Sequence, residues 1–341
     1  MKKLFIISLV TLGLSGTLTA QQESQFTQFY LNPYIFNPAA SGMTSLIDVN
    51  LGFRQQWAGF SGAPRTIFGT VHSRIKFNKK DGNALQEFRP DGAFFSSPQV
   101  STGVLKHVVG GRIYSDQMGP FNKMSLGASY SFHFPLVKSV NMSFGVSGGW
   151  SNFGLNPDKV NLYHQNDASY MNLLTNGGNQ NFFDMQAGTM IYSKYFEIGY
   201  SMTQVIGNKY AVESINTGSR FERHHFIYLA GNIDLNETWT VSPALFMRTV
   251  KNAPFNFEGM LRVQYKRMTW LGVGYRNTGS LTISAGANFA KNFRIGYSYD
   301  AGIGKYRNVQ SGGSHEILLG FMIGKNRKLE KEIDKSKKEE E

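Results

Sequence analysis

The sequence predicts an all-β protein, a transmembrane antiparallel β-barrel of about 14 strands, within a range of roughly 12 to 16. Three observations predict this fold. Aromatic residues make up 14% of the chain and charged residues only 17%, below the roughly 25% charged residues of soluble domains. No apolar run after residue 20 approaches the length of a membrane-spanning helix. Segments of about ten residues alternate apolar with small or polar side chains, as barrel strands do.

The first 20 residues have the layout of a secretory signal peptide. Lys2 and Lys3 precede an apolar stretch from Leu4 to Leu14, and small residues follow up to Ala20. A transmembrane anchor is the alternative, but this stretch is shorter than the roughly 20 residues that span a bilayer as a helix. We therefore expect residues 1–20 to be removed during export to the outer membrane.

The rest of the chain is expected to form one domain, because no Pro/Ser-rich linker or shift in composition divides it. Residues 21–45 are interpreted as a periplasmic or plug-like segment and 46–324 as the outer-membrane barrel. Residues 325–341 carry seven basic and six acidic side chains. They are interpreted as a solvated, charged periplasmic tail.

Two predicted hairpins show the alternation most clearly. From 124 to 134 the even positions are apolar or aromatic and the odd ones are Ser, Gly or His, and a segment from 140 to 150 repeats this pattern. Segments 281–289 and 293–299 form the second hairpin across a three-residue connection. Less regular strands are predicted at 46–56, 66–76, 103–113, 183–192, 195–204, 223–233, 239–249, 255–266, 269–276 and 314–324.

A soluble β-sandwich or propeller would also alternate, but long strands with aromatic ends favour a barrel in lipid. Two connections are too long for tight turns, 77–102 and 152–181, and a third, 205–222, is of middling length. Barrels place long loops outside and short turns in the periplasm. We therefore expect these connections to form the outer, partner-facing surface.

The sequence offers no recognisable catalytic, metal or cofactor motif. None of the seven histidines has helical i, i+4 spacing, and the chain has no cysteine. Gly272 and Gly274 lack the third glycine of a dinucleotide fingerprint. Basic residues are spread without a dense patch. We therefore expect no enzyme, cofactor, metal or nucleic acid, and regard lipid phosphates of the outer membrane or an acidic protein as better partners for the basic chain.

Four linked motifs are more specific than the strand pattern. They are an Asn-Pro-Ala-x-x-Gly turn, an Arg-x-Gln-Trp strand end, a Gly-Ala-Pro-x-Thr turn and a closing Ser-His-Glu-Ile strand. In this order and spacing, over residues 25–322, they resemble the PorP/SprF family of type IX secretion membrane proteins. The candidate site residues in and around these motifs are Asn37, Pro38, Gly42, Arg54, Gln56, Trp57, Gly59, Gly62, Pro64, His315 and Glu316.

These candidate residues have a structural and a binding interpretation. Proline and glycine in the turns supply fixed and positive φ angles. Arg54 and Gln56 are expected to share one face of the first strand, either lining the lumen or contacting the preceding segment. Ala58, after the tryptophan, and the 77–102 insert depart from the family pattern and leave the choice of partner open.

The resemblance implies a role in type IX secretion and gliding motility. Such a barrel would bind, help to export or anchor a surface protein with a C-terminal sorting domain, and would contact periplasmic secretion components. A passive channel or small-solute transporter is the alternative, because it shares every barrel feature. The sequence leaves open whether residues 21–45 plug the lumen, which loops contact partners and how many copies assemble.

Overall fold

A computed structural model describes residues 24–43, 47–75, 105–137, 139–160, 170–171, 179–206, 222–289, 292–303 and 312–323. The predicted signal peptide, the charged tail and the interiors of the long connections lie outside these residues. Within them, no helix has the length and apolar character needed to cross a membrane.

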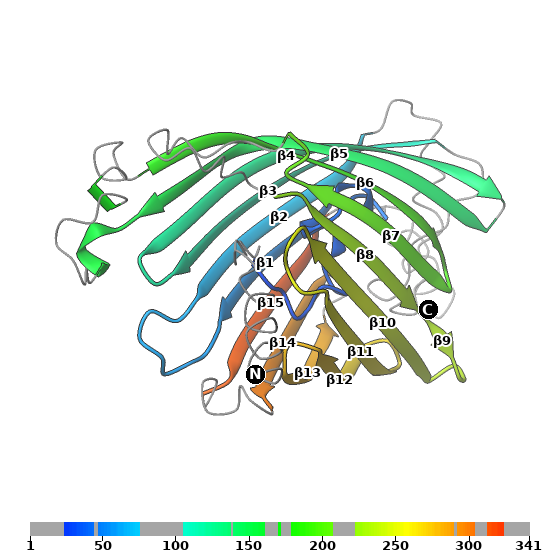
Figure 1. Ribbon diagram of the computed structural model, residues 1–341. Coiled ribbons are helices and arrows are strands. Elements are labelled where there is room, and N and C mark those ends of the chain that lie inside the picture. The colour runs from blue at the N-terminus through cyan, green and yellow to red at the C-terminus, as the bar shows by residue number, and fades with distance from the viewer. Residues whose placement is uncertain are drawn as a thin grey trace, which may run out of the picture.

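The chain forms one antiparallel sheet that closes on itself (Figure 1). The first strand pairs with both the second and the last, which completes the ring. The strands are β1 (Ile47–Gln55), β2 (Arg65–Ile75), β3 (Lys106–Met118), β4 (Phe121–Val137), β5 (Val140–Leu155), β6 (Asn179–Ser193), β7 (Phe196–Thr203), β8 (His224–Gly231), β9 (Ile233–Asp234), β10 (Trp239–Val250), β11 (Asn256–Tyr265), β12 (Thr269–Arg276), β13 (Ser280–Phe289), β14 (Phe293–Gly302) and β15 (Ser314–Ile323).

The prediction of a 14-stranded barrel is confirmed. The two-residue β9 pairs only with β10, while β8 and β11 flank β10 directly, so the closed ring consists of the other 14 strands. The predicted strands lie where these strands are found. The largest differences are in β3 and β5, which each continue five residues past their predicted ends at 113 and 150, because backbone pairing with β4 continues there.

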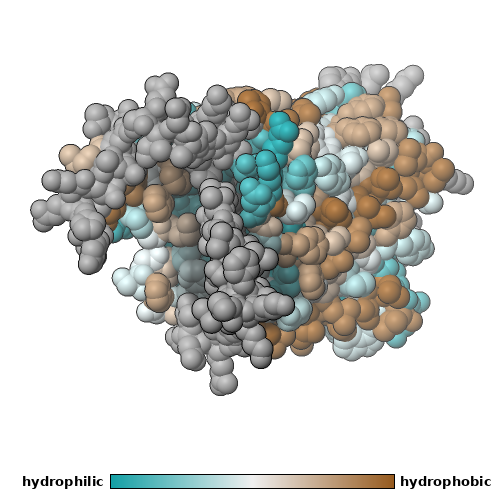
Figure 2. All heavy atoms as spheres, in the orientation of Figure 1, coloured by the Kyte–Doolittle hydropathy of each residue, from teal (hydrophilic) through white to brown (hydrophobic). Residues whose placement is uncertain are grey.

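Apolar side chains face outward and polar ones face the lumen. In β12, Leu271 and Val273 are 68% and 61% exposed, whereas neighbouring Trp270 is 4% exposed and packs inside. Brown, hydrophobic side chains cover much of the visible outer wall (Figure 2). An apolar exterior of this kind contacts lipid, because all backbone hydrogen bonds are made within the closed sheet.

The ring has two ends, which position everything inside it. We call the rim with Ile47 and Ile323, where β1 begins and β15 ends, the near end, and the rim with Gln55 and Ser314 the far end. Alternate antiparallel strands run in opposite directions, so the β2–β3 connection lies at the near end. The β5–β6 and β7–β8 connections lie at the far end.

This arrangement corrects one prediction from the sequence. Connections 77–102 and 152–181 cannot share an outer surface, because β3, β4 and β5, an odd number of strands, separate them along the ring. The 205–222 connection shares its end with 152–181, as expected.

The hydrophobic core lies inside the ring. It is built from residues 24–43, here called the luminal segment, together with inward-facing wall residues. The luminal segment contains two short 3-10 helices, η1 (Pro33–Ile35) and η2 (Pro38–Ala40). Each begins with proline, whose fixed φ and missing N–H suit a first helical position. The segment is visible in dark blue within the barrel (Figure 1).

Candidate functional site

The luminal segment runs through the lumen from the far end to the near end. Its start is bonded near the far rim, where the Thr27 hydroxyl donates to Asp300 of β14 at 2.8 Å. Its last part is bonded nearer the near rim, where Ser41 and Ser131 hydroxyls lie 2.7 Å apart. The chain then enters β1 at the near rim.

Asn37 fixes the middle of the segment. Its Oδ1 accepts a hydrogen bond from the Ala39 N–H at 2.9 Å and caps η2. Its Nδ2 donates to the backbone carbonyls of Thr189 at 3.1 Å and Tyr200 at 3.3 Å, on β6 and β7. The side chain therefore uses both ends of its amide, one within the segment and one against the wall.

Aromatic side chains of the segment pack against the wall. Phe29 stacks on Phe246 of β10 with ring centroids 5.3 Å apart. The guanidinium of Arg262 lies 4.1 Å from the centroid of the Tyr30 ring, a cation–π contact. The Tyr30 hydroxyl donates to Ser284 at 3.1 Å.

Glycines in the wall make room for the segment. A Cβ at Gly145 would overlap the backbone nitrogen of Ala39, and one at Gly188 would overlap Oδ1 of Asn37. A Cβ at Gly110 would likewise overlap the Tyr34 hydroxyl. The wall is thus shaped to the segment on β3, β5 and β6, which accounts for part of the small-residue face seen in the sequence.

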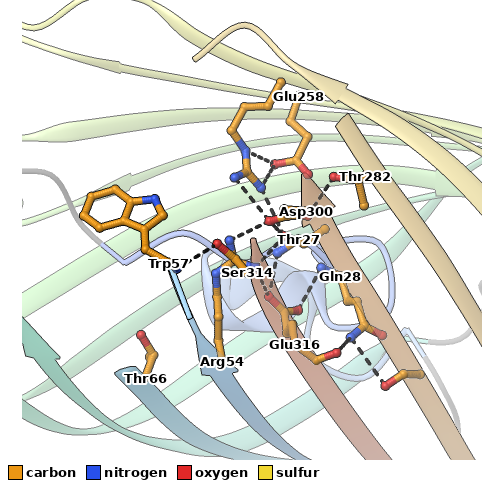
Figure 3. Close-up of polar contacts among 12 residues, drawn as sticks. Thr27, Gln28, Arg54, Trp57, Thr66, Glu258, Thr282, Asp300, Ser314 and Glu316 are labelled. Carbon is orange, nitrogen blue, oxygen red and sulfur yellow. Dashed lines mark hydrogen bonds and ion pairs between the residues drawn. The ribbon is translucent and has the colours of Figure 1, made fainter. Parts of the chain in front are cut away.

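A buried charged cluster joins the segment to the barrel where β1 meets β15 (Figure 3). Arg54 of β1 contacts Asp300 at 2.7 Å and Glu316 of β15 at 3.0 Å. Thr27 lies at the centre: its hydroxyl accepts from Arg54 at 2.6 Å, and its backbone N–H donates to Glu316 at 2.8 Å. The backbone N–H of Gln28 donates to the other oxygen of the same carboxylate at 2.9 Å.

A second arginine extends the cluster along the wall. Arg276 of β12 lies 2.7 Å from Glu258 of β11 and 3.5 Å from Asp300. It also donates to the Thr27 hydroxyl at 3.1 Å. We call Arg54, Glu258, Arg276, Asp300 and Glu316 the seam cluster. Because these side chains are almost fully buried, each charge depends on its partners for stabilisation.

The structure brings some of the predicted site residues together in the lumen. Arg54 and Glu316 are in direct contact, and Asn37 and Pro38 lie in the segment that they help to hold. Gly42 has a φ of +71°, donates its N–H to His72, and stands where a Cβ would overlap Val108. Glycine is required there by both conformation and space.

The remaining candidates lie at the far rim or outside the barrel. Gln56 directly follows the end of β1, and its backbone N–H donates to the Pro64 carbonyl at 2.8 Å, so the face that its side chain shares with Arg54 stays a prediction. Trp57 has a φ of +46° and donates its N–H to Ser314. His315 faces outward, and its Nδ1 lies 2.8 Å from the Tyr297 hydroxyl.

The other two glycines shape the same far-rim turn. Gly59 and Gly62 have φ angles of +88° and +74°. The Gly62 carbonyl accepts from the N–H of Gly119 in the β3–β4 turn at 2.9 Å. These residues build a rim and do not touch the seam cluster.

Sequence reasoning missed Thr27, Glu258, Arg276 and Asp300. The last three are charged residues on the inward face of strands whose inward neighbours are mostly small or polar. A search for charges on that face could have found them. Within the described part of the chain, no group of three or more His, Cys, Asp or Glu side chains could hold a metal ion.

A closed, 14-stranded ring with a lipid-facing apolar exterior defines an outer-membrane β-barrel. The family model of the type IX secretion system membrane protein PorP/SprF matches residues 18–321. This chain therefore belongs to the PorP/SprF family.

The chain is also similar to solved outer-membrane proteins. One is the Ralstonia pickettii toluene transporter TbuX, at 11% identity over 85% of this chain and 93% of that chain, with a TM-score of 0.45. Another is the Acinetobacter baumannii outer membrane protein Omp33, at 9% identity over 83% of this chain and 100% of that chain, with a TM-score of 0.42. Among proteins with curated annotation, none matches this sequence.

Proposed function

We propose that this barrel is a binding component of type IX secretion and gliding motility, which holds, helps to export or anchors a surface protein with a C-terminal sorting domain. The observation that carries the proposal is the luminal segment, which is held across the lumen from rim to rim by hydrogen bonds, aromatic packing and the seam cluster. A filled lumen suits a rigid scaffold for binding. The family and fold are those of a secretion membrane barrel, and the proposed mechanism breaks no bond.

The lengths of the connections support an orientation for this scaffold. The far end carries three of the four longest connections, 156–178, 204–223 and 303–313, whereas the near end carries the fourth, 76–105, and the short turns 138–139, 194–195 and 290–292. Because barrels place longer loops outside, we assign the far end to the cell surface. Cargo then binds at the far end, while the β2–β3 connection and the 325–341 tail meet periplasmic components.

Affinity purification from detergent-solubilised outer membranes, followed by mass spectrometry, tests this function. We expect a large protein with a sorting domain and periplasmic secretion components to accompany the barrel. Replacing 207–221 with a short Gly/Ser linker should lose the surface protein and keep the periplasmic partners. The matched replacement of 80–100 should keep the surface protein and lose the periplasmic partners. A barrel recovered alone would contradict the proposal.

The rival function is a passive channel, which shares the barrel fold. None of the luminal contacts described above favours it. Planar bilayer recordings separate the two. We expect the intact mature chain to show no stable conductance, because residues 24–43 pack across the lumen. Stable conductance of the intact chain would favour the channel.

A further inference from the structure

A pocket opens between the luminal segment and the wall toward the far end. It is partly open to solvent. Its lining comes from the segment as far as Phe36, from the middle of β3 and β6, and from far-end portions of β7, β8, β10, β11 and β12. The segment therefore leaves part of the outward-facing half of the lumen unfilled.

One side of the pocket is apolar and aromatic. Phe29 and Phe36 of the segment meet Phe246 of β10, with ring centroids 5.3 and 4.5 Å from it, and Phe226 of β8 stacks on Phe246 at 5.6 Å. Ile35 completes this side. Burying a further apolar group against this surface is favourable, because it removes apolar surface from water.

The other side is polar and is lined by arginines. Three of them line the pocket, Arg112, Arg248 and Arg276, and Arg276 is paired with Glu258 and Asp300. Arg112 is 6% exposed; its nearest carboxylate oxygen, on Asp184, is 4.0 Å away, and its Nε has no hydrogen-bond partner among the described residues. A buried guanidinium with a spare donor favours an anion.

Gln186 of β6 adds a second feature. It is 2% exposed and lines the pocket, and its Oε1 has no hydrogen-bond partner within the described structure. A buried acceptor without a hydrogen bond is unfavourable, and a ligand N–H that pairs with it removes that cost. The pocket therefore offers a donor for an anion, an acceptor for an N–H and an aromatic surface for an apolar group.

We infer that this pocket binds the C-terminal residue of a partner polypeptide, whose apolar side chain, free carboxylate and amide N–H match these three features. The inference rests on the proposed function only in taking the partner to be a protein at the far end. A free aryl or acyl carboxylate would satisfy the arginine and the aromatic surface but would leave Gln186 unpaired.

Calorimetry on the detergent-solubilised mature chain tests the inference with small probes. N-acetyl-L-phenylalanine carries all three features, N-acetyl-L-phenylalaninamide lacks the carboxylate, and 3-phenylpropionate lacks the amide. We expect the first probe to bind at least tenfold more tightly than either of the others. Equal binding of the first probe and 3-phenylpropionate would overturn the inference in favour of a free carboxylate, and absence of binding would overturn it outright.

Two variants locate the binding. Gln186→Leu should weaken the binding of N-acetyl-L-phenylalanine to the affinity of 3-phenylpropionate. The affinity for 3-phenylpropionate itself should not change. Arg248→Gln should weaken the binding of both carboxylate probes. Arg294→Gln changes a buried luminal arginine outside the pocket and should weaken the binding of neither. Retention of the unboiled, folded band on gels controls for folding. An unchanged preference in Gln186→Leu would contradict the assignment.

The outcomes separate this inference from the proposed function. In one outcome, a surface protein co-purifies equally well with the unchanged chain, Gln186→Leu and Arg248→Gln, and no probe binds. That outcome would support the proposed function and contradict the binding role given to the pocket. Probe binding without any co-purified partner would do the opposite.

Discussion

At the scale of single residues, the seam cluster depends most on Arg54. This side chain is 1% exposed and neutralises carboxylates on two strands while it binds the segment through Thr27. Its motif singled it out from the sequence, as it did Glu316. Its contacts with Asp300 and Thr27 were not predicted, because contacts between β1, β14 and the segment join residues far apart in sequence.

Arg54→Met should destabilise the barrel by about 3–5 kcal/mol, because removing one partner of a buried ion pair leaves the carboxylates uncompensated. The urea midpoint for loss of the unboiled, folded band on gels measures this. Arg65→Met, at the exposed end of β2 where the arginine donates to Gln117, is the matched control and should shift the midpoint little. Equal shifts would contradict the role given to Arg54.

Gly145→Ala tests the fit of wall to segment. The new Cβ would overlap the backbone of Pro38 and Ala39, so the segment must move, and we expect a loss of about 1–3 kcal/mol in unfolding free energy. Gly111→Ala is the control, since its Cβ would make only ordinary contact, 3.7 Å from Val71. Urea titrations of both variants measure the difference, and a neutral Gly145→Ala would argue against close packing.

At the scale of elements, the strands were predictable and the path of the luminal segment was not. Period-two alternation is a local signal that each strand carries by itself, as β12 and β13 show. The turns of η1 and η2 would look the same in a periplasmic segment. Their position depends on glycines and serines of distant strands. In the sequence these small residues indicate only the polar face of a strand, not a contact with the segment.

A disulfide can test where the segment lies. The chain has no cysteine, and the Ser41 and Ser131 hydroxyl oxygens are 2.7 Å apart. We expect Ser41→Cys with Ser131→Cys to form a disulfide on mild oxidation, seen as a reductant-sensitive shift of the denatured band. Ser41→Cys with Ser151→Cys is the control, because position 151 lies toward the far end of β5. A bond in the control and none in the first pair would reverse the direction of the segment.

At the scale of the whole molecule, the error about the long connections was avoidable. Strand parity alone assigns each connection to an end, so a strand count of 14 already places 77–102 and 152–181 on opposite sides. Which end faces the cell surface is a separate matter, because it depends on the membrane and not on the ring.

Labelling of single cysteines in intact cells measures this orientation. Phe60, in the far-rim turn after β1, is 60% exposed, and Leu235, at the near end before β10, is 64% exposed. We expect a membrane-impermeant maleimide to label Phe60→Cys in intact cells and Leu235→Cys only after the outer membrane is permeabilised. The opposite pattern would invert the assignment.

The position of Thr27 constrains how the barrel assembles. Its contacts reach β1, β12, β14 and β15, and the β1–β15 pair is the one that turns an open sheet into a ring. The luminal segment runs from rim to rim. It is enclosed most simply if it packs against the curved, still open sheet before the first and last strands pair. The segment then serves as a template during insertion, with Glu316 and Arg54 meeting across it, and the folding of the ring and the filling of its interior become one event.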